Sequence, residues 1–187
     1  MQPFKKKPTN MYITNDQIYP PLAEYIKEYR IVKAINEAKD EDETPDEYPR
    51  VPDAVGRAVL LIAERLATKP NFSGYSYIQD MIGDGYENCI RYIHNFDPDK
   101  SKNPFSYITL IIHRAFVRRI QKEKTHSYIR HKLVLSNSDI IDMMGAEAAS
   151  VGEVGSVNLT KSSEVVTKYE DSLAEKKRKA KARKEAK

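Results

Sequence analysis

Asp80 and Asp84 are the acidic residues best spaced for chemistry, because a separation of four places both carboxylates on one side of a helix. Such a pair could transfer protons or bind Mg²⁺. No third acid, lysine or histidine joins them in a nuclease-like pattern, so we expect no enzymatic activity. We interpret the pair as part of a charged side of the helix that also holds Glu87 and Arg91. Because three of its four residues are acidic, we call it the acidic stripe, and we expect it to face solvent or a partner.

Residues that could bind a metal ion or a phosphate are too scattered to form a site. The four histidines lack the i, i+4 and His-x-Glu spacings that bring two ligands together, and Cys89 is the only cysteine. The run Gly83-Asp84-Gly85 has no lysine and lies within a helical pattern, which favours close helix packing over a phosphate loop. We therefore expect neither a metal ion nor a cofactor.

A basic cluster is the stronger functional signal. Residues 110–132 carry seven basic residues and one acid. Among them, Arg114, Arg118 and Lys122 recur every four residues, with Arg119 beside them, and could follow the phosphates of a nucleic acid along a groove. A solvated basic face is the plainer alternative.

Two aromatic residues, Phe105 and Tyr107, precede the basic cluster. Aromatic rings beside arginines suit stacking on unpaired bases, but both rings could equally lie in the core. Helical phase places Phe105 with Ile108 and Ile112, which favours the core for Phe105 and leaves Tyr107 open.

Helical periodicity dominates the chain and predicts an all-α protein. Apolar residues recur at three- and four-residue steps in four segments, which are 16–39, 53–68, 76–95 and 104–124. Pro20-Pro21 predicts the start of the first helix, and Asn103-Pro104 predicts the start of the last. We expect these helices to form a small bundle.

The chain divides into three parts. Residues 1–15 are expected to be a flexible arm, residues 16–132 a helical domain, and residues 133–187 a flexible connector and basic tail. An acidic loop at residues 36–53, with eight acids, two bases and three prolines, interrupts the domain and is expected to form no packed element.

Most of the excess positive charge lies at the end of the chain. The formal net charge is +4, yet residues 172–187 alone hold eight bases and two acids. For this segment, salt-sensitive DNA binding and a disordered solubilising tail both remain open, and a frayed or partner-induced helix is allowed from residue 162. No apolar run approaches the ~20 residues that span a bilayer, and no secretory signal is visible, which favours an intracellular protein.

Several motifs in order resemble a known family. The run Asp80-Met81-Ile82-Gly83-Asp84-Gly85, followed by Phe96-Asp97 and by Phe105-Ser106-Tyr107-Ile108-Thr109, resembles conserved region 2 of bacterial RNA polymerase sigma factors. The closer likeness is to the small late-transcription sigma factors of T-even-type phages, through segments such as Asn71-Phe72-Ser73-Gly74-Tyr75 and Phe116-Val117-Arg118-Arg119-Ile120. The resemblance covers about residues 54–124.

This resemblance implies a sigma-like initiation factor that binds the β′ clamp helices of bacterial core RNA polymerase. Such a factor directs the polymerase to −10-like late promoters and assists DNA opening, in the cytoplasm of an infected bacterial host. The likeness assigns polymerase binding to Asp80, Met81, Asp84 and Glu87. It assigns contacts with promoter DNA to Tyr107, Arg114, Arg118, Arg119 and Lys122.

The resemblance also concerns two further partners, a co-activator and the sliding clamp. It leaves other functions of the protein open. A phage co-activator is allowed, whereas the basic run Lys176–Lys181 stands where the late factors have an apolar and acidic epitope for the DNA sliding clamp, so clamp binding is not implied. One alternative is a regulatory protein that binds the polymerase clamp without reading a promoter. Another is a non-specific DNA-binding module driven by the tail, and a metal-dependent nuclease comes last.

Overall fold

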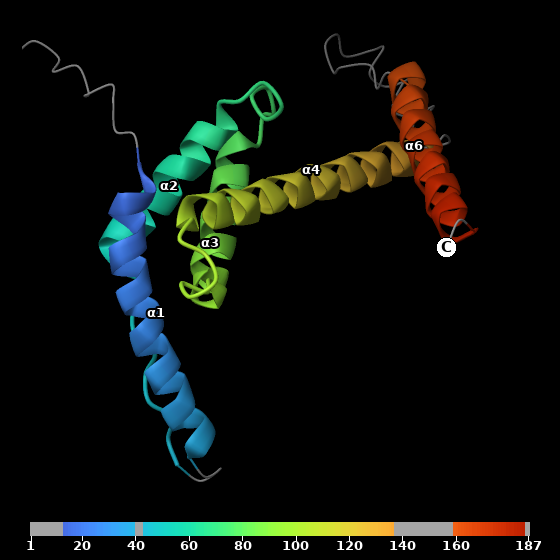
Figure 1. Cartoon of the computed structure of the whole chain (residues 1–187). Helices are drawn as coiled ribbons and strands as arrows, with labels where there is room; N and C mark the ends of the chain where they lie inside the picture. The colour runs from blue at the N-terminus through green and yellow to red at the C-terminus, as the bar shows by residue number, and fades with distance from the viewer. Residues whose placement is uncertain (1–12, 40–42, 137–158, 186–187) are drawn as a thin grey trace, which may run out of the picture. The chain divides into compact units, whose positions relative to one another are not determined.

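The structure is a computed structural model that describes residues 13–39, 43–136 and 159–185 (Figure 1). These residues form α1 (Asn15–Ala38), α2 (Asp53–Ala67), α3 (Ile78–Tyr92), a 3₁₀ turn η1 (Ile93–Asn95), α4 (Pro104–Ser136) and α6 (Leu159–Glu185). They contain no strand, so the expected all-α fold is confirmed. Most of the predicted arm and of the connector lies outside the described residues. Within the described ranges, no helix is long and apolar enough to cross a membrane.

The chain forms two compact units, residues 1–119 and residues 120–187. In the first unit, α2 packs on α3 and α1, and the first half of α4 completes the core. Burying one large apolar side chain stabilises the folded state by roughly 1.5–3 kcal/mol. The fully buried large residues of this core come from all four helices and include Ile18, Leu22, Ile26, Val55, Val59, Met81, Ile108, Ile112 and Phe116.

Helix α1 begins at Asn15, so the prediction that Pro20-Pro21 sets its start is wrong. Thr14 is extended, and its backbone N–H donates a hydrogen bond of 3.2 Å to Gln17 Oε1, which caps the earlier turn. The two prolines lack N–H groups and cannot donate in the helical ladder. Burial of Ile18 and Leu22 on either side of them holds this turn in the core.

The predicted start of α4 is confirmed. Asn103 Oδ1 accepts a hydrogen bond of 3.0 Å from the backbone N–H of Ser106, and Pro104 is the first helical residue. A second side chain, that of Asn15, accepts a hydrogen bond of 3.1 Å from the Phe105 backbone N–H. The start of α4 is therefore fixed to the start of α1.

The described part of the acidic loop, residues 43–52, forms no helix or strand, as expected, but it is attached to α1. The amide of Asn36 donates to the Asp46 carbonyl oxygen at 3.0 Å and accepts from the Asp46 N–H at 2.7 Å. Lys39 Nζ lies 2.8 Å from Asp46 Oδ1. Local hydrogen bonds thus compensate for the missing secondary structure.

Tyr29 of α1 is sandwiched between two other rings. Its centroid lies 4.7 Å from that of Tyr48 and 4.6 Å from that of His94, with interplanar angles of 23° and 20°. Burial lowers the pKa of His94, and the nearby positive charge of Lys33 lowers it further. The stack therefore favours the neutral imidazole.

The lowered pKa of His94 predicts a pH dependence of stability. The unfolded chain takes up this proton more readily than the folded one, so the contribution is fully present above about pH 6.5 and is lost as the pH falls through the folded pKa. We expect the free energy of unfolding in urea to fall less between about pH 7.5 and about pH 5.5 in His94→Gln than in the wild type. Equal declines in the two proteins would contradict this account.

In the second unit, secondary structure extends further than the sequence indicates. Helix α4 continues to Ser136, beyond the expected end near Lys124. Residues 159–185, expected to be connector and tail with a helix allowed from residue 162, form α6. The two helices pack on each other, with the rings of Tyr128 and Tyr169 stacked at 4.5 Å. In these segments the apolar pattern of either helix is too short to stabilise that helix alone. The packing of α4 and α6 on each other therefore stabilises both.

Candidate functional site

The two aspartates of the acidic stripe bind one arginine of α4. Arg119 Nη2 lies 2.9 Å from Asp80 Oδ2, and Arg119 Nη1 lies 3.3 Å from Asp84 Oδ2. Because the aspartates are four residues apart, both carboxylates lie within reach of the planar guanidinium fork. We call Asp80, Asp84 and Arg119 the α3–α4 clasp.

The clasp leaves its carboxylates partly open to solvent. The Arg119 side chain is 19% exposed, whereas those of Asp80 and Asp84 are 57% and 37% exposed. The acidic stripe, which was expected to face solvent or a partner, therefore faces α4 on one side and solvent on the other. Arg119 orients both carboxylates, which can still accept hydrogen bonds from a cation outside the molecule.

Glu87 and Met81, the other two residues that the resemblance assigns to polymerase binding, lie in different environments. Glu87 is exposed and forms an ion pair of 2.5 Å with Arg91, one helical turn later. Met81 has no exposed surface and packs in the core. Of the four residues, Asp80, Asp84 and Glu87 therefore present surface, and Met81 supports α3 from within.

Gly85 lets α3 and α4 approach closely at this place. A Cβ atom at Gly85 would lie 2.9 Å from Phe116 Cε1 and 3.0 Å from Ile112 Cγ2, too close for either neighbour to remain in place. A Cβ atom at Gly83 would have no neighbouring atom within 4 Å. Close helix packing, the interpretation that the sequence favoured for the Gly83-Asp84-Gly85 run, is thus confirmed at Gly85 alone.

The basic residues of α4 are placed less uniformly than their spacing indicates. Arg114 and Lys122 are exposed, and neither forms an ion pair with a described residue. Arg118 donates a hydrogen bond of 2.8 Å to Asn88 Oδ1, while the Asn88 amide donates to the Asp84 carbonyl oxygen. Sequence reasoning missed Asn88, although its position one helical turn after Asp84 was a signal that it lies near the clasp.

The two aromatic residues before the basic cluster lie in different environments, and Phe105 departs from its prediction. Phe105, predicted to lie in the core, is 38% exposed, and that prediction is wrong: Pro104 takes the buried position of the first turn instead. Tyr107 is half-buried, its ring lies 5.3 Å from that of Phe96, and its hydroxyl donates a hydrogen bond of 3.0 Å to the Tyr92 carbonyl oxygen. Burial raises the pKa of Tyr107, with a smaller contribution from Cys89.

Reactive groups do not gather around these residues. Burial raises the pKa of the Cys89 thiol to about 12, so the nucleophilic thiolate does not form near neutral pH. Among the described residues, no three histidine, cysteine, aspartate or glutamate side chains could together hold a metal ion.

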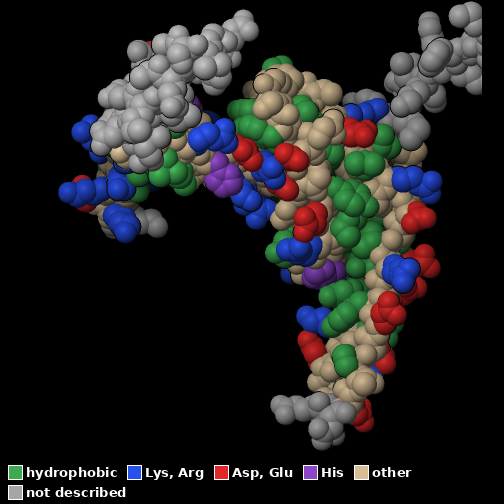
Figure 2. Space-filling view, turned by 180° about the vertical axis from the view of Figure 1, so that it is seen from behind, with side chains coloured by type: hydrophobic (Ala, Val, Ile, Leu, Met, Phe, Trp, Pro, Cys, Tyr) green, Lys and Arg blue, Asp and Glu red, His purple; other side chains and the backbone are tan. Residues whose placement is uncertain are grey.

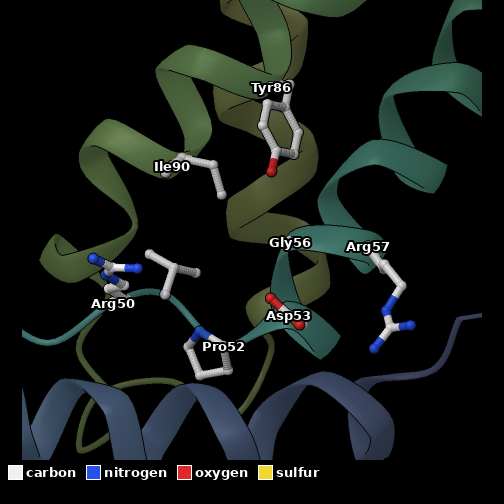
Figure 3. A pocket seen from close by; sticks show the side chains of 8 residues that line it. Arg50, Pro52, Asp53, Gly56, Arg57, Tyr86 and Ile90 are labelled. Atoms are coloured by element: carbon white, nitrogen blue, oxygen red, sulfur yellow. The ribbon is translucent and has the colours of Figure 1, made fainter.

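Among the described residues of the first unit, two cavities lie near the candidate site residues or the start of α2. One, of about 470 Å³, is lined by Ile13, Ile62, Arg65, Leu66, Lys69, Phe105 and Thr109, and it places the exposed Phe105 ring beside two cationic residues. The other, of about 480 Å³, lies at the start of α2, where the Tyr86 hydroxyl points toward Gly56 between Arg50 and Arg57 (Figure 3). Asp53 places a negative charge in this second cavity.

The surface of the first unit carries both signs of charge. On the face shown in Figure 2, acidic and basic side chains are interspersed and hydrophobic side chains remain exposed between them. Large exposed apolar residues of this unit include Ile31, Ile35, Leu60 and Leu110. On this face, charges of neither sign form a broad patch.

Comparison with known proteins identifies the class of this domain. Residues 53–126, from the first residue of α2 into the middle of α4, match the sigma-70 region 2 family. No curated protein matches the sequence. The chain therefore contains a sigma-70 region 2 domain, a non-enzymatic transcription-factor domain that indicates binding of RNA polymerase and melting of promoter DNA.

Proposed function

We propose that this protein is a sigma-like transcription initiation factor that directs core RNA polymerase to −10-like late promoters and assists their opening. Two observations support the proposal: the region 2 match over residues 53–126, and the α3–α4 clasp, which holds two carboxylates at the surface of that domain. The clasp is the main structural support for the proposal, because it links the acidic helix α3 to the basic helix α4.

In this proposal the acidic face of α3 binds arginines of the β′ clamp helices. Asp80 and Asp84 are already oriented by Arg119, which lowers the entropy lost when they accept further hydrogen bonds. Glu87 extends the negative surface by two helical turns from Asp80. Complementary charge of this kind gives orientation and association rate more than raw affinity.

The DNA contacts in this proposal belong to α4. Arg114 and Lys122 are free of ion pairs within the described residues, so they can neutralise phosphates at once, whereas Arg118 first gives up its bond to Asn88. Arg119 acts through the clasp. For stacking on an extruded base, Tyr107 would have to release the Tyr92 carbonyl, and the exposed ring of Phe105 is a second candidate.

The proposal extends to the biological setting. Because the motifs are similar to those of the late sigma factors, we propose that the protein acts at late promoters of a T-even-type phage. It would act in the cytoplasm of an infected bacterium, together with a phage co-activator. Recruitment by a sliding clamp does not follow from this similarity, because the run Lys176–Lys181 is strongly basic.

A charge reversal at Glu87 tests the polymerase face without breaking the clasp. We expect Glu87→Arg to weaken binding to bacterial core RNA polymerase by about 10-fold or more, which corresponds to ~1.4 kcal/mol, because it places a like charge against the arginines of the clamp helices. Co-migration in gel filtration at several concentrations measures the effect.

Arg91→Glu is the matched control for this experiment. It replaces the Glu87–Arg91 pair by two like charges one turn apart, as Glu87→Arg does, but makes the face more acidic. The control should bind polymerase at least as well as the wild type. Equal binding by all three proteins would contradict the assignment of this face.

A further inference from the structure

The first half of α6 is attached to α4 by a compact set of contacts. Tyr169 stacks on Tyr128, and its hydroxyl lies 3.0 Å from Thr125 Oγ1. Glu170 Oε1 accepts hydrogen bonds of 3.0 Å from both Lys132 Nζ and the Tyr128 hydroxyl. These bonds lower the pKa of Glu170, with Lys132 as the larger cause, and hydrogen bonds to Tyr128 and then Glu170 raise the pKa of Lys132 to about 12.

The contact continues at the start of α6. Ser162 is buried, and its hydroxyl lies 3.0 Å from His131 Nδ1. All of these α6 contacts fall between residues 162 and 170, in the half of the helix that precedes the basic segment. The attachment comprises one ring contact and four side-chain hydrogen bonds, so the register of α6 on α4 is well defined.

The second half of α6, residues 174–185, is exposed at every position. It holds seven lysine and arginine residues against two glutamates. Lys179 and Lys181 pair with Glu175 and Glu185. The other five cations form no ion pair within the part of the chain that the structure describes, and they are Lys176, Lys177, Arg178, Arg183 and Lys184.

This half has no apolar face that could pack on protein or enter a lipid surface. Its uncharged residues are Ala174, Ala180 and Ala182, and successive cations at 176–179 turn by about 100° each, so that positive charge surrounds the helix. An interfacial membrane helix needs large apolar residues on one side. Stacking on single-stranded bases needs aromatic rings, and this segment has none.

The spacing of charge matches duplex DNA. At 1.5 Å per residue, residues 176–184 extend over roughly 13 Å and present seven cations, about one every 2 Å. Double-stranded DNA carries one negative charge about every 1.7 Å along its axis. A helix of this charge density can neutralise phosphates in many orientations and reads no base sequence.

We propose that residues 174–185 form a DNA-binding arm: a cationic helix, anchored on α4 by its preceding half, that binds the backbone of duplex DNA independently of sequence. Binding also stabilises the helix, because like charges one turn apart, as at Lys177 and Lys181 or at Lys179 and Arg183, repel each other until phosphates neutralise them. This arm adds to the proposed promoter contacts of α4 and does not depend on them.

The test measures binding of the full chain to a labelled duplex that lacks a −10-like element, by fluorescence anisotropy over a salt series. In the arm variant the five unpaired cations are replaced by glutamine, so Lys176, Lys177, Arg178, Arg183 and Lys184 lose their charge. Each phosphate contact contributes about −0.9 to the slope of log K against log salt. We expect the variant to lose up to ~4 units of slope and to bind about 100-fold more weakly at low salt.

A charge-retaining variant controls for changes in side-chain shape. Lys176→Arg, Lys177→Arg and Arg178→Lys together keep the number of cations, and glutamine, lysine and arginine have similar helix propensities. This variant should keep the wild-type slope and affinity. Circular dichroism should show added helix when DNA is mixed with the wild type or with this control, and no added helix with the arm variant.

Three outcomes decide the proposal. A wild-type salt slope in the arm variant would overturn it. The proposal would also be overturned if the arm variant bound DNA like the wild type but no longer co-migrated with core polymerase. The arm would then bind an acidic protein surface. Loss of DNA binding with polymerase binding intact supports the arm. Failure of both wild type and variant to bind polymerase would count against the sigma-like function alone.

Discussion

Replacing Gly85 by alanine is expected to lower the free energy of unfolding by about 1–3 kcal/mol, the usual cost of inserting a methyl group into a packed core. The added Cβ would lie 2.9 Å from the Phe116 ring, and that ring is held edge-on by Phe72 at a centroid distance of 5.2 Å. Both aromatic residues are buried, with exposed fractions of 0% for Phe116 and 5% for Phe72, so neither can move easily into solvent. Chemical denaturation monitored by circular dichroism measures the change.

Gly83→Ala is the matched control, since it makes the same substitution two residues earlier in the same helix. Nothing lies within 4 Å of the added Cβ atom at Gly83, and alanine is the better helix former, so this variant should gain up to ~1 kcal/mol of stability. Opposite signs for the two variants are the expected result. Equal effects would mean that α3 and α4 do not approach closely at Gly85.

Replacing Arg119 by glutamine is expected to destabilise the first unit by about 1–2 kcal/mol, because each of its two partly exposed ion pairs contributes up to about 1 kcal/mol. The substitution removes both bonds of the clasp and leaves Asp80 and Asp84 one turn apart without the cation between them. Arg119→Lys should recover only part of the loss, because a single ammonium group cannot replace the planar fork.

A double-mutant cycle with Asp84→Asn isolates the clasp from general effects of the Arg119 substitution. We expect a coupling energy of about 0.5 kcal/mol or more between the two sites, measured by urea denaturation. Additive effects would show that the contact contributes no net stability. Polymerase binding should also weaken in Arg119→Gln, because the carboxylates lose their fixed orientation.

The helices of the first unit could largely be predicted from sequence because their apolar residues recur regularly and their ends carry local signals. Asn103-Pro104 marks the start of α4 through a cap that lies within four residues. The start of α1 was mispredicted, since proline's local preference was outweighed by burial of Ile18 and Leu22. The sequence allowed a helix from residue 162, but the extension of α4 and the packing of α6 on it depend on contacts such as Tyr128 with Tyr169, which no local pattern reveals.

The candidate site could also be predicted from the sequence only in part. The spacing of Asp80 and Asp84 placed both carboxylates on one side of α3, but the partner that they share lies 35 to 39 residues away. Arg30 likewise reaches Asp97 across 67 residues and fixes α1 to the loop after η1. Periodicity predicts which side of a helix is polar, whereas tertiary packing decides which cation meets it.

Opening of promoter DNA is the most direct test of the sigma-like function. The measurement is permanganate reactivity of thymines in an AT-rich, late-type promoter, incubated with core RNA polymerase alone, with this protein alone and with both. Our account predicts reactive thymines near the −10-like element only in the complete mixture, and their loss with Glu87→Arg. Polymerase binding without any opening would contradict it and favour a regulatory protein that binds the polymerase clamp without reading a promoter.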